Sequence, residues 1–316
     1  GLGSIPAAML TTEQLQNELV AFADAIAIDI DIGGNSRKTD SWGELLPVNV
    51  NFFCHKAPDA QAETEAAWRL KLTPAYQAHG IDPASVGSGP GRAPFSEESL
   101  AMLEKLEKLG QSKPAVVSFH FGLPKAEWVA QLKAWGIQVW SSATTVQEAH
   151  WLEQNGADAI IAQGLEAGGH RGIFDPRGVD QQLTIRDLVQ ELAQHLQIPI
   201  VAAGGIMNGA DIHGIIRVGA SAAQLGTAFL VTAEAGSSPA HRRFVLTKHE
   251  LGAAFTRAFS GRPAQGVKNK YMSLMEGKTY LPFPLQNNMT AAMRQWAAQH
   301  DEGDYQNLWA GTEYAR

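Results

Sequence analysis

Short apolar runs alternate with amphipathic stretches along almost the whole chain. The runs have the length of buried strands, and in the stretches between them apolar residues recur at helical spacing. The predicted strands are residues 2–5, 47–53, 115–119, 138–142, 159–163, 198–203 and 222–225, and the predicted helices include residues 12–26, 61–78, 97–109, 124–135, 145–155 and 288–300. This alternation is typical of βα units, in which helices cover a parallel sheet.

Seven strands are one fewer than a (β/α)8 TIM barrel contains. The chain begins without methionine, on a strand-like segment that starts at Gly1. We therefore expect an α/β fold of the TIM-barrel type whose first strand is missing from the given chain.

Two regions are longer than a minimal barrel requires. Residues 55–112 contain two predicted helices, the first with a kink or a restart at Pro74, and a stretch rich in Gly, Pro and Ser at 85–94. Residues 232–286 follow the last strand as a helical excursion, and loops of this length are usually lids or binding loops. The predicted domains are a barrel over 1–231 with a helical insertion at about 55–112, a helical lid or subdomain over 232–286, and a terminal helix over 287–316 that returns to the barrel.

The composition is that of a globular protein with a sizeable core, since 45% of the 316 residues are hydrophobic and 18% are charged. The net charge of −7 and the lack of any run of Lys or Arg argue against nucleic acid or an anionic membrane as a partner. The single cysteine, Cys54, cannot form an internal disulfide, which favours a reducing compartment. No apolar stretch approaches the roughly 20 residues that span a bilayer. We therefore predict a cytoplasmic protein.

A glycine-rich turn follows one of the predicted buried strands. Residues 163–172 read QGLEAGGHRG, which places His170 directly behind Gly168 and Gly169. Glycines allow backbone N–H groups to approach an anion or a flat ring closely. The turn therefore indicates a cofactor site, while a plain turn with an incidental histidine is the alternative.

Two further glycine turns follow the next two predicted strands, at residues 204–205 and 224–227. Barrels commonly bind phosphate at this place, with backbone amides and a helix N-terminus. Each turn alone could be simple turn chemistry, but together they favour a phosphorylated cofactor. The chain has neither a GxxxxGK[ST] loop nor a GxGxxG fingerprint in a βαβ context, so an ATP site or a Rossmann NAD site is not indicated.

These motifs together resemble the nitronate monooxygenase family, formerly called 2-nitropropane dioxygenases. The resemblance covers nearly the whole chain and rests on GLEAGGHRG at 164–172, VAAGGI at 201–206, QLGTAFL at 224–230, VSFHFG at 117–122 and GLGSIP at 1–6. The Ala-Pro-Met turn of the family is absent, which agrees with a truncated start. The resemblance implies an FMN-dependent (β/α)8 barrel. The residues that it assigns to FMN binding are Asn51, Gln163, Gly168, Gly169, Gly204, Gly205, Gln224, Leu225, Gly226 and Thr227.

Two histidines are candidates for catalysis. By the same resemblance, His170 faces the reactive edge of the flavin, where a neutral imidazole could remove a proton from the carbon next to a nitro group and an imidazolium could hold the oxygens of a nitronate. His120 follows a predicted strand on the same side as Ser118 and is a candidate to face the substrate. Structural roles remain the alternatives for both, and Arg171 could either attract an anionic substrate or pair with a neighbouring residue.

The predicted function is the FMN-dependent oxidation of a small anionic nitronate, such as propionate 3-nitronate, by O2 to a carbonyl compound and nitrite. No metal is predicted. One alternative is an FMN-dependent NADH:quinone or enoyl-thioester reductase on the same barrel, and another is a flavin-free phosphate-binding barrel. The sequence does not give the oligomeric state, for which a homodimer is one option.

Overall fold

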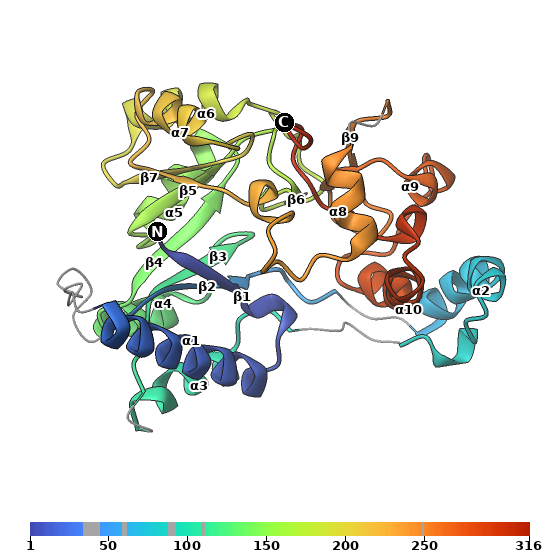
Figure 1. Ribbon diagram of the computed structural model, residues 1–316, viewed down its shortest axis with the longest axis horizontal. Helices are drawn as coiled ribbons and strands as arrows, with labels where there is room; N and C mark the ends of the chain where they lie inside the picture. Colours follow the sequence, from blue (N-terminus) through green and yellow to red (C-terminus); the bar gives the residue numbers. More distant parts are fainter. Residues whose placement is uncertain (34–44, 59–61, 88–92, 109–110, 248–249) are drawn as a thin grey trace. The chain divides into compact units, whose positions relative to one another are not determined.

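The computed structural model describes residues 1–33, 45–58, 62–87, 93–108, 111–247 and 250–316 (Figure 1). Residues 88–92 of the predicted Gly/Pro/Ser stretch lie outside the described residues. Within them the main sheet has seven strands, in the order β1-β2-β3-β4-β5-β7-β8. The strands are β1 (Gly3–Pro6), β2 (Leu46–Phe53), β3 (Pro114–His120), β4 (Gln138–Ala143), β5 (Ala159–Gln163), β7 (Ile200–Ala203) and β8 (Ala222–Gln224). Each lies where the sequence predicts a strand, and their sequential order is that of a TIM-type α/β fold.

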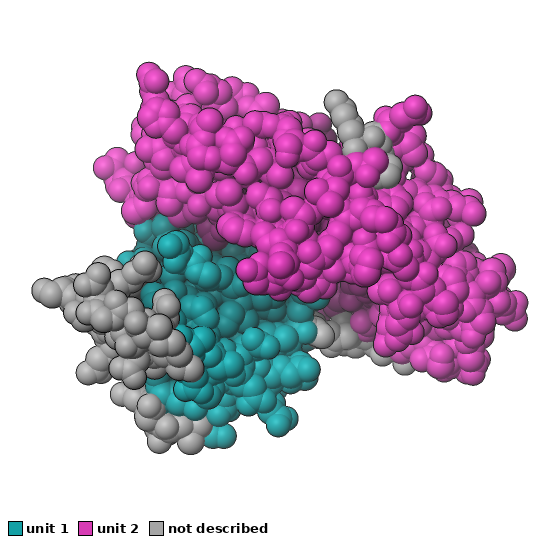
Figure 2. Space-filling model, viewed as in Figure 1, with its two compact units in different colours: residues 1–56, 92–143, 147–160 teal, residues 57–91, 144–146, 161–316 magenta. Residues whose placement is uncertain are grey.

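The chain divides into two compact units, which Figure 2 shows in teal and magenta. Unit 1 comprises Gly1–Lys56, Arg92–Ala143 and Gln147–Ile160, and unit 2 comprises Ala57–Gly91, Thr144–Val146 and Ile161–Arg316. Each unit is described by itself below.

Unit 1 contains parallel strand pairs covered by helices. The pairs β1/β2, β2/β3 and β3/β4 are all parallel. On β2, Val48 and Val50 are buried in one apolar cluster with Leu15 and Leu19 of helix α1 and Leu103 of α3. The apolar periodicity of these helices therefore covers the strands as expected. The helices are α1 (Thr12–Gly33), α3 (Glu97–Lys108), α4 (Ala126–Ala134) and α5 (Val146–Gln154), with the 3-10 turn η1 (Ala7–Met9) after β1.

The first part of unit 2 carries the last parallel strands and their helices. Strands β7 and β8 pair in parallel. Helix α6 (Ile185–His195) begins at Thr184, whose hydroxyl accepts a hydrogen bond from Asp187 N–H. Helix α7 (Gly209–Ile216) begins at Asn208, whose side chain accepts from the second and third residues of the helix. These N-caps fix where both helices begin. The 3-10 turn η3 (Thr227–Phe229) follows β8.

The rest of unit 2 adds a small antiparallel sheet and a helical layer. The sheet has the order β6-β10-β9, formed by β6 (Gly169–His170), β10 (Ala264–Val267) and β9 (Ala253–Thr256). Helices α2 (Ala62–Ala78), α9 (Lys270–Leu274) and α10 (Leu285–Gln299) share one apolar cluster. The 3-10 turns η2 (Pro83–Ser85) and η4 (Gly303–Tyr305) complete the unit. Helix α2 contains Pro74 as an internal residue.

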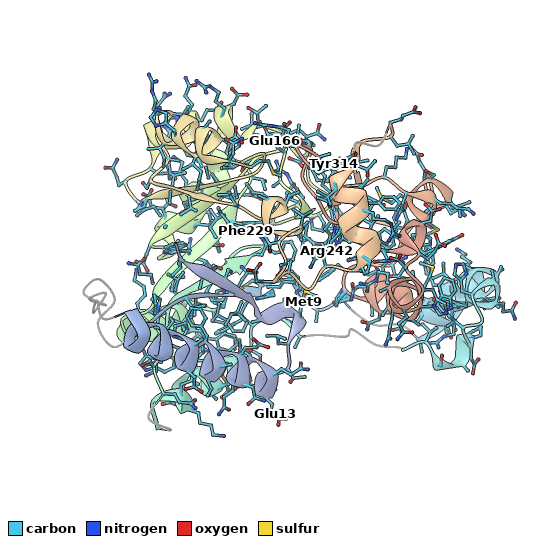
Figure 3. All side chains as sticks on the ribbon, viewed as in Figure 1. Met9, Glu13, Glu166, Phe229, Arg242 and Tyr314 are labelled. Carbon is cyan, nitrogen blue, oxygen red and sulfur yellow. The ribbon has the colours of Figure 1, made fainter. Side chains whose placement is uncertain are left out.

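The region predicted as a helical excursion contains α8 (Pro239–Leu246) and α9, and in addition the strands β9 and β10, which the sequence did not predict. Arg242 of α8, labelled in Figure 3, donates hydrogen bonds to the backbone carbonyls of Thr232 and Ala235. These bonds tie the segment after η3 to the helix. No helix in the described ranges is both long and apolar enough to cross a membrane.

Candidate active site

A cavity of about 260 Å³ in unit 2 brings together the glycine turns that follow β5, β7 and β8. Nine of the predicted cofactor-binding residues belong to unit 2, and Leu225 is the one of them that does not line this cavity. The lining residues that the sequence predicted are Gln163, Gly168, Gly169, Gly204, Gly205, Gln224, Gly226 and Thr227. The lining residues that it missed include Glu166, Ile206, Met207, Leu230, Trp309, Gly311 and Glu313.

Four backbone amides at this cavity have no hydrogen-bond partner among the residues that the structure describes. In the described part of the chain, no hydrogen bond uses the N–H groups of Gly205, Ile206, Gly226 or Thr227. Of these four residues Ile206 is buried, and folded proteins pair nearly all buried N–H groups with protein, water or ligand acceptors. Asn208 already caps the first amides of α7, so the donors left for a ligand are those of the turns. Such a set of amides suits an anion.

The glycines of the turns are required by their backbone geometry and by close packing. Gly204 and Gly205 have φ angles of +126° and +67°, which other residues adopt rarely. A Cβ atom on Gly168 would lie 2.5 Å from the carbonyl carbon of Ala310, and one on Gly204 would lie 3.0 Å from the backbone nitrogen of Ala167. Both close approaches allow backbone segments to form the wall of the cavity.

Gln163 fixes the turn that carries His170. Its Nε2 donates to the carbonyl oxygen of His170 at 2.9 Å, and its Oε1 accepts from Gly172 N–H at 2.7 Å. Gln163 also lines the cavity, but its amide group holds the protein backbone. The residue that the sequence assigned to cofactor contact therefore also positions the candidate catalytic turn.

His170 lies beside the wall of the cavity. Its Nε2 lies 2.9 Å from Oγ of Ser260. Its ring centroid is 5.4 Å from that of Phe283 and 5.8 Å from that of Trp309, which lines the cavity. Sequence reasoning missed Ser260 and Trp309, because neither belongs to a periodic run or follows a predicted strand.

Arg171 has a structural role. Of the two interpretations of the sequence, pairing with a neighbouring residue is correct, and attraction of an anionic substrate is not. Its side chain is 1% exposed. It donates to both carboxylate oxygens of Asp180, at 2.8 and 2.9 Å, and to the carbonyl oxygens of Gln163 and Gly164. Burial alone would raise the pKa of Asp180, but hydrogen bonds from Arg171 and from Gln182 N–H hold that pKa below its usual value. Arg171 thus clamps the start of the glycine turn.

Asn51 and His120 belong to unit 1. Nδ2 of Asn51 donates to Oγ of Ser118 at 2.9 Å. Nδ1 of His120 lies 2.9 Å from Oγ of Ser142, and its ring centroid is 5.8 Å from that of Phe53. Asn51 therefore makes a polar contact with β3, and His120, the last residue of β3, makes one with β4.

The C-terminal segment 308–314 supports the cavity. Gly311 N–H donates to Oγ1 of Thr227 at 3.0 Å, and Thr312 N–H donates to the carbonyl oxygen of Glu166 at 3.0 Å. Glu166, labelled in Figure 3, in turn accepts from the first amide of α6, at Ile185. The segment thereby joins the turns after β5 and β8.

His241 contacts the C-terminal segment 308–314 through a hydrogen bond that depends on pH. Its Nε2 lies 3.1 Å from the carbonyl oxygen of Trp309, so the neutral ring donates there. Burial lowers the pKa of His241, although the bond to Trp309 opposes this. A histidine with a depressed pKa binds its proton less readily in the folded state than in the unfolded chain. Its contribution to stability is therefore complete above the ordinary value of 6.5 and is lost as the pH falls below it.

We therefore expect the free energy of unfolding to decline when the pH is lowered from about 7.5 to about 5.5. The variant His241→Gln keeps a donor without the titration and should show a smaller decline in urea unfolding. His213→Gln, on the exposed side of α7, is the control and should behave like the wild type. An unchanged decline in His241→Gln would show that another group causes it.

Sequentially ordered parallel strands, a glycine-lined cavity beyond the late strands and a histidine beside it define an α/β enzyme of the TIM-barrel type. The family model described as nitronate monooxygenase matches residues 1–316. The chain belongs to the nitronate monooxygenase family and is an oxidoreductase of that family.

Known relatives agree with this assignment. The chain is 40% identical over 271 residues to the nitronate monooxygenase of Paraburkholderia phytofirmans, an alignment that covers 84% of this chain and 72% of the relative. It is 39% identical over 271 residues to that of Pseudomonas aeruginosa, covering 84% and 75%. Among solved structures, nitroalkane oxidase from Streptomyces ansochromogenes has a TM-score of 0.80 at 30% identity, covering 100% of this chain and 83% of that one.

Proposed function

We propose that this chain oxidises alkyl nitronates with FMN and molecular oxygen, giving a carbonyl compound and nitrite. The observation that carries the proposal is the cavity of unit 2, where turns whose amides have no partner in the described ranges adjoin Trp309 and, beside it, His170. Membership of the nitronate monooxygenase family supports the choice of substrate.

The residues at the cavity fit the phosphate end of FMN. A phosphate is an anion with several acceptor oxygens, which matches the amides of Gly205, Ile206, Gly226 and Thr227. The cavity, at about 260 Å³, is slightly smaller than the 300–1,000 Å³ that is typical of small-molecule sites. It therefore suits part of FMN rather than the whole cofactor. When bound, FMN would supply the electron acceptor, while the protein supplies binding and orientation.

His170 has two roles that depend on the substrate. Toward a neutral nitroalkane, its neutral imidazole acts as the base that takes the proton from the carbon next to the nitro group. A nitronate has already lost that proton, so there the ring positions the substrate oxygens. His120 is proposed as a second substrate-facing residue.

The barrel and lid boundaries, the cytoplasmic location and the homodimer remain further proposals.

The test is aerobic turnover of FMN-loaded protein with ethylnitronate and propionate 3-nitronate, following oxygen uptake and nitrite. We expect nitrite to form only when protein, FMN and oxygen are all present. Free FMN without protein is the control. Absence of nitrite from fully loaded protein would overturn the proposal, and steady NADH consumption by the same protein would favour the reductase alternative.

A further inference from the structure

The ring of His170 is held by a residue far away in the sequence. Ser260 lies in the loop between β9 and β10, and its side chain is buried, with 1% of the residue exposed. Its Oγ is 2.9 Å from Nε2 of His170. The antiparallel pairing of β6 with β10 places His170 opposite Ala264 and so creates this contact.

Ser260 also makes two hydrogen bonds with the backbone of Arg262. Its hydroxyl donates to the carbonyl oxygen of Arg262 at 3.2 Å, and its oxygen accepts from the N–H of Arg262 at 3.4 Å. A carbonyl oxygen can only accept, so the bond to Arg262 uses the hydroxyl proton. With the hydroxyl proton placed there, the serine oxygen offers a lone pair to His170, and the 2.9 Å contact is then donated by Nε2 of His170.

The orientation of the ring is fixed by other contacts as well. Gln163 holds the backbone carbonyl of His170 at 2.9 Å. Phe283 and Trp309 lie against the ring, at centroid distances of 5.4 and 5.8 Å. With the ring orientation fixed in this way, the hydrogen bond at Nε2 favours the tautomer that donates there.

We propose that Ser260 is a positioning residue that keeps neutral His170 in the Nε2–H tautomer, so that Nδ1 carries the basic lone pair. In proton abstraction from a nitroalkane, the C–H bond breaks, its electron pair stays on the nitronate formed, and the proton forms an Nδ1–H bond. Ser260 accepts from Nε2–H before and after this step. The identity of the substrate rests on the proposed function, whereas the tautomer is a property of the protein alone.

The first test is NMR of FMN-loaded protein labelled with ¹⁵N-histidine, at a pH where the ring of His170 is neutral. The variant His170→Gln identifies the signals of His170. We expect the proton on Nε2 in the wild type and in Ser260→Thr, which keeps the hydroxyl, and a mixture of tautomers in Ser260→Ala. Ser273→Ala, an exposed serine of α9 whose hydroxyl also donates to a backbone carbonyl, is the control and should match the wild type.

An Nδ1–H tautomer in the wild type would overturn the proposal, whether or not Ser260→Ala folds, and so would an unchanged tautomer in a folded Ser260→Ala. The kinetic readout is the comparison of nitroethane with ethylnitronate. In Ser260→Ala we expect kcat to fall about tenfold for nitroethane and to change less than about twofold for ethylnitronate, with recovery in Ser260→Thr. If the protein oxidises no nitronate, the proposed function fails while the NMR result still decides the role of Ser260.

Discussion

His170→Asn is expected to lower kcat/KM for nitroethane by about 10²- to 10⁴-fold, the usual contribution of a general base. For ethylnitronate the loss should stay below about tenfold, because this substrate is already deprotonated and needs only positioning. Oxygen uptake with each substrate, measured on FMN-loaded protein, gives the two ratios.

His195→Asn provides the matched control, because it makes the same exchange at an exposed position in the last turn of α6. It should leave both substrates unaffected. Equal losses for nitroethane and ethylnitronate in His170→Asn would contradict the role of the ring as a base and would leave it a binding role.

Arg171→Met is expected to lower the free energy of unfolding by about 2–4 kcal/mol and to reduce FMN binding. Loss of one partner of a buried ion pair costs about 3–5 kcal/mol because the other charge is left unpaired. The lower range applies here because the side chain of Asp180 is 21% exposed. The change also removes the two bonds that hold the carbonyls of Gln163 and Gly164, at the start of the glycine turn.

The chain offers a matched exposed pair for comparison. Arg177 and Asp175 are 87% and 60% exposed, so Arg177→Met should leave the urea midpoint unchanged. The pKa of Asp180 is depressed in the folded protein, so its pairing stabilises above the usual value of about 4 and is lost as the pH falls through the lower folded value. Similar urea midpoints for the two variants near neutral pH would contradict the clamp that we assign to Arg171.

Most of the main sheet could be predicted because strands such as β5 and β7 are short, buried apolar runs that stand apart from their neighbours. Strands β6, β9 and β10 could not. Strand β6 has two residues, and β10 reads Ala-Gln-Gly-Val, all buried, with no alternation of polar and apolar positions. Such strands are specified by their pairing partners rather than by their own pattern.

The candidate site also contains some residues that the sequence pattern predicts and others that it does not. The glycine turns were found because each follows a predicted strand, and positive φ angles such as that of Gly205 restrict the choice of residue. Ser260 and Trp309 carry no such local signal. They reach His170 across 90 and 139 residues of sequence, through strand pairing and through the C-terminal segment. The role of Arg171 also depended on its partner, Asp180, which the turn alone does not reveal.

The most direct test of nitronate oxidation by this protein is anaerobic mixing of FMN-loaded protein with propionate 3-nitronate and, separately, with NADH, while the flavin spectrum is followed. If the protein is a nitronate monooxygenase, the nitronate should change the flavin spectrum, NADH should not bleach it, and nitrite should appear when oxygen is admitted to the nitronate sample. Full bleaching by NADH together with no response to the nitronate would contradict nitronate oxidation and would identify the protein as a reductase.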